Sequence, residues 1–243
     1  MNIHTSPLAH SIALNGTCPA CHQAEMRVFF EVPNVPTNSC IQWDTAAEAV
    51  GCPKGEIRLG VCEECGFVAN IALDPKLTEY SERYEETQAF SGTFNAFQLE
   101  LAQGLVDRHQ LKGGHVVEVG CGKGEFLALL CELGGNTGLG IDPGTDPSRL
   151  EPGVADQVEL IADFFDPAMI TRTPDLLACK MTLEHIPDPL TFTKDMADGV
   201  SGKGTRLFLQ VPDALRIFED VALEDIYYEH CNYSTADSLA RLA

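Results

Sequence analysis

The residues that most constrain the fold of this chain are Glu118-Val119-Gly120-Cys121-Gly122-Lys123-Gly124. A short apolar run at 115–119 leads into the glycines, and apolar residues at helical spacing follow them at 125–130. A strand, a glycine turn and a helix in this order are typical of a doubly wound parallel α/β sheet, in which glycine lets the backbone approach a ligand closely. A dinucleotide fingerprint would place its last glycine at position 125, which is Glu125, so the pattern disfavours a nicotinamide cofactor.

The spacing that remains is E-x-G-x-G-x-G, and it resembles motif I of the class I S-adenosylmethionine-dependent methyltransferases. S-Adenosylmethionine carries an ammonium and a sulfonium but no phosphate, so its site needs negative groups and close backbone rather than a phosphate cradle. The resemblance implies that the acid and the turn hold this cofactor, through Glu118, Gly120, Cys121, Gly122 and Gly124.

Further acids stand where the next predicted strands end. The second predicted strand, at 137–142, ends in Asp142, which is placed to accept hydrogen bonds from both ribose hydroxyls. The third, at 158–162, is followed by Asp163 and Phe164, and the resemblance implies that this pair holds the adenine amine and ring. An ordinary strand-to-helix connection would not need acids at successive strand ends, so these features together predict a cofactor site.

Two more predicted strands complete a doubly wound sheet. They lie at 174–181 and at 206–212, with helices predicted between the strands. A full class I methyltransferase sheet adds an antiparallel pair of strands after the fifth, yet the residues after Pro212 contain no further β-rich run. We therefore expect a Rossmann-like α/β sheet truncated after strand five, with that strand at an exposed edge where another chain could pair with it.

The charge and hydropathy of the chain disfavour several classes of partner. Sixteen Lys and Arg residues stand against thirty-six Asp and Glu residues, which gives a formal net charge of −20. Such a chain repels a polyanion, so a nucleic-acid methyltransferase is disfavoured. No stretch reaches the ~18 apolar residues of a membrane span, and residues 1–14 lack the basic start and apolar core of a signal peptide. We expect a cytoplasmic protein that binds neither nucleic acid nor membrane.

Ten cysteines in a reducing compartment predict a metal site or simple burial rather than disulfides. Four of them form two C-x-x-C knuckles whose spacing fits tetrahedral zinc: Cys18, Cys21, Cys62 and Cys65. Cys40 and Cys52 lie between the knuckles and could compete as ligands. A redox role for either pair lacks its βαβ context, and unliganded buried cysteines are the remaining alternative. Four thiolates leave no open position, so we expect zinc with a structural role.

The segment between the knuckles is longer than a compact zinc ribbon allows, so it must hold a large loop or strands of its own. Residues 32–36 are rich in turn formers, whereas 57–61 predict a strand that leads into the second knuckle. From Asp74 to His109 the pattern is helical, with aromatic residues among acids. These boundaries predict a zinc-binding domain at 1–74, a helical connector at 75–109 and a methyltransferase domain at 110–243.

The stretch Tyr227-Tyr228-Glu229-His230-Cys231-Asn232-Tyr233-Ser234 narrows the resemblance. Zinc knuckles, a class I core and a Y-x-E-H-x-x-Y-F-S-like stretch together resemble the C-methyltransferases of nucleotide-linked keto-sugars and their relatives. The resemblance implies that His230 removes a proton next to a ketone and that Glu229 orients it. It also implies that the sugar site is lined by Tyr227, His185 and either Tyr80 or Tyr84. One departure is that Ser234 follows Tyr233 without an intervening Phe.

The implied chemistry is consistent with these residue types. Carbon is a weak nucleophile, so its methylation requires a base and a group that stabilises the enolate oxygen, and histidine is the natural base near neutral pH. The sequence therefore predicts C-methylation next to a ketone of a nucleotide-linked keto-sugar or a related small molecule. The alternatives are an O- or N-methyltransferase of a small metabolite, which needs no enolising base, and an inactive cofactor-binding fragment.

Overall fold

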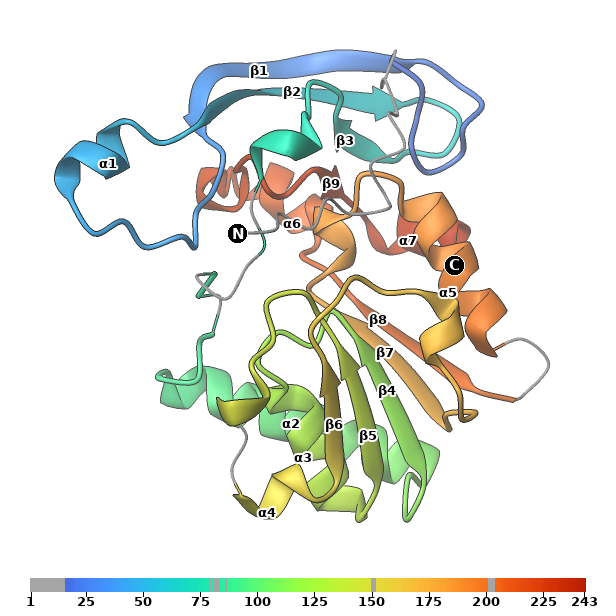
Figure 1. The fold of residues 1–243 in the computed structure, drawn as a ribbon. Coiled ribbons are helices and arrows are strands. Elements are labelled where there is room, and N and C mark those ends of the chain that lie inside the picture. Colours follow the sequence, from blue (N-terminus) through green and yellow to red (C-terminus); the bar gives the residue numbers. More distant parts are fainter. Residues whose placement is uncertain (1–15, 79, 81–83, 86, 150–151, 201–203) are drawn as a thin grey trace. The chain divides into compact units, whose positions relative to one another are not determined.

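The computed structural model describes residues 16–78, 80, 84–85, 87–149, 152–200 and 204–243. The chain forms two compact units, each assembled from separate stretches of sequence (Figure 1). Unit 1 comprises Met1–Glu79, Leu183–Lys194 and Val211–Ala243, and unit 2 comprises Tyr80–Thr182 and Asp195–Gln210. The units differ from the expected domains at 1–74, 75–109 and 110–243, because the residues after Thr182 are divided between them.

Unit 2 contains the parallel sheet that the strand pattern predicts. Its strands are β4 (His115–Val119), β5 (Thr137–Ile141), β6 (Val158–Ile161), β7 (Leu176–Lys180) and β8 (Arg206–Gln210). They pair in the order β6-β5-β4-β7-β8, all parallel, so the strand order reverses between β4 and β7. Ligands of such sheets bind beyond the carboxyl ends of the strands at this switch point, where the predicted cofactor residues stand.

Helices cover this sheet and complete its core. The helices with residues in unit 2 include α2 (Gly92–His109), α3 (Glu125–Gly134), α4 (Pro152–Ala155) and α5 (Pro189–Val200), the last of which begins in unit 1. Short 3-10 turns form at η2 (Pro147–Arg149) and η3 (Pro167–Met169). Helix α2 packs against α3, and α3 packs against β4 and β5 (Figure 1). The buried apolar cluster of this unit includes Leu105 of α2, Leu127 of α3 and Leu176 of β7.

Strand β8 lies at one edge of the parallel sheet, as the strand pattern predicts. Within the described ranges it pairs with β7 and has no neighbour on its other side. The side chain of Leu207 on this strand is 44% exposed. An unpaired strand edge that carries apolar side chains is a place where a further strand can add.

Unit 1 is built on an antiparallel sheet of β1 (Met26–Pro36), β2 (Lys54–Cys62), β3 (Val68–Asn70) and β9 (Asn232–Tyr233), paired in that order. The strand predicted at 57–61 is confirmed as part of β2. The turn predicted at 32–36 is wrong, because this stretch continues β1 through a shift of register. Asn34 takes the left-handed conformation there (φ 58°), and an edge strand such as β1 tolerates prolines.

Strand β9 lies after Pro212, where the pattern predicts no strand. Val68 of β3 pairs with Tyr233 of β9, and an isolated bridge joins Asp213 to Ser234. A strand of two residues is too short to show the alternation by which strands are predicted. Because β9 pairs with β3, the segment 211–243 belongs to the same unit as the N-terminal cysteines.

Unit 1 also contains α1 (Ala46–Val50), α6 (Ala214–Glu219) and α7 (Ala236–Leu242), with 3-10 turns at η1 (Pro75–Leu77), η4 (Leu183–His185) and η5 (Leu223–Asp225). Its apolar core includes Ile57, Ile217 and Tyr228. The Tyr228 ring lies so close to Gly55 that a Cβ there would overlap it, and its hydroxyl accepts a hydrogen bond from Asp74 N at 2.8 Å. These contacts fix the stretch that carries the predicted catalytic residues.

The predicted connector is helical only in part. Helix α2 begins after Ser91, whose hydroxyl accepts a hydrogen bond from Phe94 N at 3.2 Å. Serine is a favourable N-cap residue, so the helix begins here rather than further toward the N-terminus. Before it, residues 75–77 form the single turn η1, and residues 79, 81–83 and 86 of the expected connector lie outside the described ranges.

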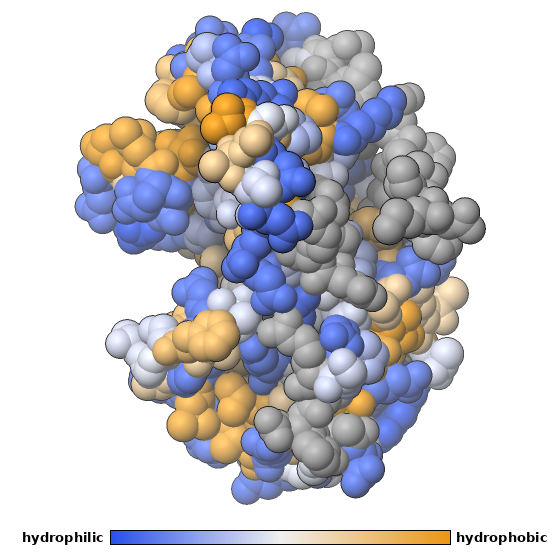
Figure 2. Space-filling view, turned by 60° about the vertical axis from the view of Figure 1, so that its left-hand side comes forward, coloured by the Kyte–Doolittle hydropathy of each residue, from blue (hydrophilic) through white to orange (hydrophobic). Residues whose placement is uncertain are grey.

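The surface carries both polar and apolar residues. Figure 2 shows one face, on which polar surface is interrupted by apolar patches. The exposed large apolar side chains include Val50, Phe90 and Leu207. None of the helices in the described ranges combines the length and apolar character needed to traverse a lipid bilayer.

Candidate functional site

The glycine turn that follows β4 is tightly packed. Gly120, Gly122 and Gly124 all have positive φ, at 73°, 54° and 81°. A Cβ on Gly120 would overlap the side chain of Thr182, whose hydroxyl donates to the Gly120 carbonyl at 3.2 Å. Only glycine adopts a positive φ and leaves room for the Thr182 side chain without strain. The turn therefore presents main-chain atoms at the switch point of the sheet.

Asp142 follows β5 and braces this turn. Its carboxylate accepts hydrogen bonds from Gly122 N at 3.0 Å and from Gly144 N at 2.7 Å. Desolvation by burial raises the pKa of Asp142, and these bonds oppose the rise. Each carboxylate oxygen has a second lone pair, so Asp142 keeps acceptor capacity for hydroxyl groups such as those of a ribose.

Glu118 is buried at the end of β4. Its carboxyl group interacts with Leu127 N in the first turn of α3, and Oε2 has no hydrogen-bond partner among the described residues. Burial raises the pKa of Glu118 to about 8, and the charge of Lys180 opposes that rise. A buried carboxyl group whose charged form is disfavoured becomes more stable when a cationic donor binds to it, and an ammonium group would be such a donor.

Asp163 and Phe164 follow β6, so acids stand at the carboxyl ends of three adjacent parallel strands. Asp163 is exposed and accepts a hydrogen bond from Phe164 N at 2.7 Å. The donor and acceptor groups at these strand ends fit S-adenosylmethionine. A buried carboxylate oxygen suits its ammonium group, the Asp142 carboxylate suits its ribose, and the glycines permit close approach of the backbone.

Lys123 is a buried cation inside the turn that motif reasoning does not single out. Its Nζ donates to the Gly144 carbonyl at 2.6 Å, in the loop that follows Asp142. Its charge lowers the pKa of Asp142, against the effect of burial. A charged residue between two turn glycines is the sequence signal that points to this contact.

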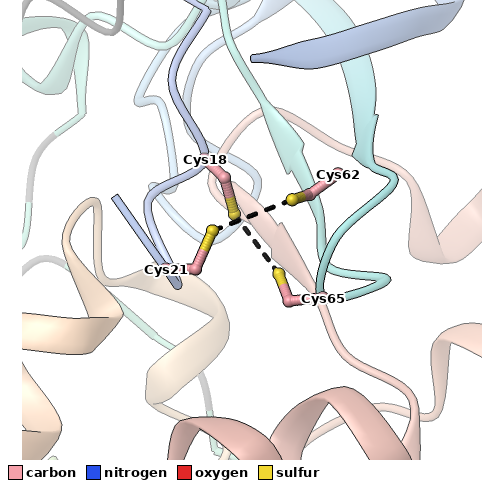
Figure 3. Close-up of side chains that lie close together, drawn as sticks. All are labelled: Cys18, Cys21, Cys62 and Cys65. Atoms are coloured by element: carbon pink, nitrogen blue, oxygen red, sulfur yellow. Dashed lines mark hydrogen bonds between the residues drawn. The ribbon is translucent and has the colours of Figure 1, made fainter. Parts of the chain in front are cut away.

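The four knuckle cysteines converge in unit 1, as Figure 3 shows. Their Sγ atoms all lie within 4.8 Å of one another, with Cys18 and Cys65 3.6 Å apart and Cys21 and Cys62 3.8 Å apart. Each knuckle is closed by a main-chain hydrogen bond to the carbonyl of its first cysteine, at 2.9 Å and 2.8 Å. Four sulfur donors this close fit a tetrahedral metal ion and leave no position open.

Burial favours the protonated form of two thiols in this cluster when no cation is bound. Burial raises the pKa of Cys18 above its usual range and that of Cys65 to about 11. Thiols in such a place become thiolates when a cation binds them. Cys40 and Cys52, the alternative ligands, are not members of this cluster. The four cysteines that lie together are thus the four whose spacing predicts a metal site.

A second group of polar side chains gathers in unit 1 around two histidines. We call Glu184, His185, Tyr227 and His230 the histidine cluster. The ring centroids of His185 and His230 are 4.9 Å apart, and the Tyr227 hydroxyl lies 2.5 Å from His230 Nε2. One possible ligand atom from each of Glu184, His185 and His230 lies within 4.8 Å of the others. The structure thus brings three of the predicted catalytic residues together and adds Glu184.

Residues of β9 and its approach hold the cluster in place. Asn232 Nδ2 donates to the carbonyls of Leu183 at 3.3 Å and Ile186 at 2.5 Å, on either side of the turn that carries Glu184. Cys231 Sγ donates to the Glu184 carbonyl at 3.4 Å. The long-range pairing of β9 therefore fixes the backbone of η4.

Burial keeps both histidines of the cluster neutral. It lowers the pKa of His185 to about 3 and that of His230 to about 4. The His185 ring hydrogen-bonds to the backbone of Glu229, and the His230 ring to that of Asp225. A neutral ring that donates from one nitrogen carries a lone pair on the other. In His230 the Tyr227 hydroxyl lies 2.5 Å from Nε2, so this lone pair accepts the hydroxyl hydrogen, and a proton or a metal ion can bind there only in place of that hydrogen bond.

The carboxylate of Glu229 faces a different partner from the one that the resemblance implies. It is buried and accepts hydrogen bonds from Ser39 N at 2.5 Å, from Ser39 Oγ and from Asn38 Nδ2 at 3.2 Å. These bonds secure the loop at 38–39, whereas the ring of His230 contacts Tyr227 and the backbone of Asp225. Side chains of neighbouring residues in a turn point in different directions, so adjacency in sequence does not predict contact.

The two connector tyrosines belong to unit 2. Tyr80 and Tyr84 have ring centroids 5.3 Å apart, and Tyr84 is buried. The histidine cluster belongs to unit 1. The role of Tyr80 or Tyr84 in lining the sugar site stays a prediction.

A known protein family matches more than half of the chain. The family model described as "Methyltransferase domain" matches residues 94–243. The matched region includes the glycine turn, the parallel sheet of unit 2 and the histidine cluster.

Curated relatives match shorter stretches. A ubiquinone biosynthesis O-methyltransferase from Colwellia psychrerythraea is 27% identical over 122 residues, which cover 48% of this chain and 49% of the relative. Another, from Cupriavidus pinatubonensis, is 40% identical over 88 residues, which cover 32% of this chain and 34% of the relative. The matches thus span about half the length of these relatives, or less.

Solved structures with a similar fold include the plantazolicin methyltransferase BpumL in complex with SAH and an O-methyltransferase family protein from Burkholderia thailandensis. The first is 15% identical, with coverage of 63% of this chain and 64% of that one and a TM-score of 0.45. The second is 19% identical, with coverage of 61% and 51% and a TM-score of 0.46. At these identities the likeness concerns the fold alone.

Proposed function

We propose, because this chain belongs to the methyltransferase domain family, that it transfers a methyl group from S-adenosylmethionine to a small-molecule acceptor. The observation that carries this proposal is the glycine turn, beside which Glu118 Oε2 is buried with no hydrogen-bond partner in the described ranges. A site of this kind suits a ligand that is cationic and has no phosphate. The net charge of −20 favours a small acceptor over a nucleic acid.

We assign the cofactor to residues of unit 2. When bound, S-adenosylmethionine supplies an electrophilic methyl group. Glu118 accepts hydrogen bonds from its ammonium group, and Asp142 accepts them from its ribose hydroxyls. Asp163 and Phe164 contact its adenine. The backbone platform consists of Gly120, Cys121, Gly122 and Gly124.

The first candidate for the methylated atom is a carbon next to a ketone, in a nucleotide-linked keto-sugar or a related small molecule. His230 Nε2 takes the C–H proton, which leaves an enolate as the nucleophile. Once Nε2 carries this proton, it donates to the Tyr227 oxygen 2.5 Å away, and the Tyr227 hydroxyl hydrogen is then free to donate to the enolate oxygen. Asn232 positions the turn that carries the second histidine of the cluster.

The second candidate for the methylated atom is an oxygen. It is favoured by the relatives named ubiquinone biosynthesis O-methyltransferase and by the Glu184 carboxylate beside two neutral imidazoles. A hydroxyl oxygen is a good nucleophile once it has lost its proton, so this reaction needs no enolising base.

Methyl transfer from isotopically labelled S-adenosylmethionine to a panel of keto-sugar nucleotides and phenolic metabolites tests the proposal. In deuterated water a C-methylating enzyme exchanges the hydrogen next to the ketone, whereas an O-methylating enzyme does not. His230→Ala should abolish turnover and leave cofactor affinity unchanged, and His109→Gln, outside the cluster, should change neither. A chain that binds no S-adenosylmethionine in calorimetry would contradict the proposal for both candidates.

We also propose that the four knuckle cysteines hold a structural zinc ion. The converging Sγ atoms support this assignment, because a four-sulfur donor set leaves no position for a substrate. Elemental analysis should find zinc in the purified chain, and Cys62→Ser should abolish that content. Purified, folded protein without any bound metal would contradict the assignment.

A further inference from the structure

The histidine cluster contains the donors of a second metal centre. One oxygen of Glu184 and one ring nitrogen from each of His185 and His230 lie within 4.8 Å of one another. Bonds of about 2.1 Å to a shared ion would draw such donors to about 3.4 Å apart. Side-chain rotation alone can make a change of this size, so the backbone need not move.

The outer hydrogen bonds of the two rings are those of ligating histidines. His185 bonds to the backbone of Glu229, and His230 bonds to the backbone of Asp225. In metal sites the ring nitrogen that does not bind the ion typically donates to such a backbone carbonyl, which sets the tautomer and the orientation of the ring. Both rings meet this condition independently, although they lie far apart in the sequence.

The backbone that carries the ligands is secured by side chains outside the donor set. Asn232 bonds to the carbonyls of Leu183 and Ile186, and Cys231 bonds to that of Glu184. Glu184 and His230 are also buried, at 2% and 5% exposed, so water competes weakly for their donor atoms. Ligands whose supporting residues are already in place bind a metal ion with less loss of conformational freedom.

We propose that Glu184, His185 and His230 bind a divalent transition-metal ion at a site distinct from the four cysteines. Two imidazoles and one carboxylate suit Zn²⁺, Fe²⁺ or Co²⁺, and three protein ligands leave a coordination position open for an oxygen atom. Tyr227, whose hydroxyl lies beside His230 Nε2, is placed to donate a hydrogen bond to that oxygen.

The open position indicates the acceptor class, and this step rests on the proposed function. An ion there binds a hydroxyl or enol oxygen of the acceptor and lowers its pKa, which favours O-methylation of a phenol or an enediol. A nitrogen that ligates a metal cannot take a proton, so His230 is then a ligand rather than the base of the first candidate. Metal content therefore distinguishes the two candidate reactions.

Cobalt uptake by the full chain tests the site. Metal-stripped protein is titrated with Co²⁺, whose first equivalent is expected to fill the four cysteines and refold unit 1. Binding at the cysteines is recognised by thiolate-to-metal charge-transfer absorption, which nitrogen and oxygen ligands do not produce. The wild-type chain should bind a second equivalent without further charge-transfer absorption. A titration that ends when the thiolate absorption saturates would overturn the proposal.

Ligand variants locate the second ion. His185→Gln and His230→Gln should each weaken the binding of the second Co²⁺ equivalent by at least about 100-fold. The thiolate absorption should persist in both variants, which shows in the same sample that unit 1 remains folded. His109→Gln and Tyr227→Phe should keep both ions. Tight binding of the second equivalent by either ligand variant would exclude this ligand set.

Cofactor calorimetry on the same samples separates this inference from the proposed function. Loss of the second ion with unchanged S-adenosylmethionine affinity in His185→Gln supports the metal site, whatever the acceptor is. Failure of the wild-type chain to bind S-adenosylmethionine, with cobalt uptake intact, would contradict the proposed function and support the metal site alone.

Discussion

The glycine turn of unit 2 and the histidine cluster of unit 1 are built in opposite ways. The turn presents main-chain atoms from one short segment, 118–124, braced by Asp142. The cluster presents side chains from two distant segments, 184–185 and 227–230, and Asn232 holds the backbone on either side of the first segment. A backbone site depends on conformations that only glycine adopts, whereas a side-chain site depends on long-range pairing and burial. The two regions should therefore fail under different perturbations.

Removing the zinc ion that we propose for the four cysteines should have the largest effect, and it should act on unit 1 only. Structural zinc contributes about 10 kcal/mol or more near neutral pH, so chelation should unfold unit 1 and disperse the histidine cluster. The glycine turn contains no residue of that site, so cofactor binding should survive. Hydrogen exchange should show loss of protection in β2 and β3 and its retention in β4 and β5. Equal loss of protection in both sheets would contradict the view that the two units fail under different perturbations.

Glu118→Gln should change the pH dependence of unit 2. Burial raises the pKa of Glu118 from 4.5 to about 8, so between these values the native state holds a proton that the unfolded chain releases. The free energy of unfolding therefore falls as the pH rises through this window. Glutamine does not titrate, so the variant lacks this pH dependence. At about pH 8 it should be more stable than wild type by roughly 3–5 kcal/mol. Denaturant unfolding at several pH values in this window measures the free energy of unfolding of both proteins. The same pH dependence in wild type and variant would contradict the prediction.

Gly120→Ala should destabilise unit 2 by roughly 3 kcal/mol and weaken cofactor binding. A methyl group there meets both a positive φ of 73° and the side chain of Thr182. Gly113→Ala is the matched control, because its φ is 67° and an added Cβ has nothing within 4 Å. The control should lose only about 1 kcal/mol of stability and no cofactor affinity. Similar losses in the two variants would show that close packing of the turn is unimportant.

Glu229→Gln should have the smallest effect of the four, and it tests unit 1. The amide nitrogen cannot accept the hydrogen bonds that the carboxylate takes from Ser39, so the free energy of unfolding of unit 1 should fall by about 1–2 kcal/mol. Exposed Glu224→Gln is the control and should stay within about 0.5 kcal/mol of wild type. Urea titrations compare the variants. A larger change in unit 2 than in unit 1 would contradict the assignment of this contact.

The parallel sheet and the glycine turn are predictable because each depends on a local pattern. Strands β4 and β7 are rich in Val and Leu, which marks strands that are buried on both faces. Asp142 is recognisable because it follows such a run at a fixed distance from the glycines. The strand ends predicted from the sequence therefore agree with the structure to within one or two residues.

The histidine cluster is predictable only in part, because it depends on a strand that leaves almost no pattern. His185 and His230 are identifiable by resemblance, but the turn that carries Glu184 is fixed by long-range bonds from Cys231 and from Asn232 of β9. The two residues of β9 are too few for alternation to be seen. The bonds from Glu229 to the loop at 38–39 likewise join residues that no local rule connects.

The pairing of β9 with β3 also affects how the protein is made on the ribosome. Val68 is synthesised early, yet its partner Tyr233 follows about 165 residues later. At translation rates of about 5–20 residues per second, β3 waits roughly 10–30 seconds for this neighbour, while the whole parallel sheet emerges. During that interval the nascent chain exposes the edge of β3 to other strands. Early metal capture at the cysteine knuckles would shorten the exposure, so cellular zinc supply is expected to influence the yield of folded protein as well as its stability.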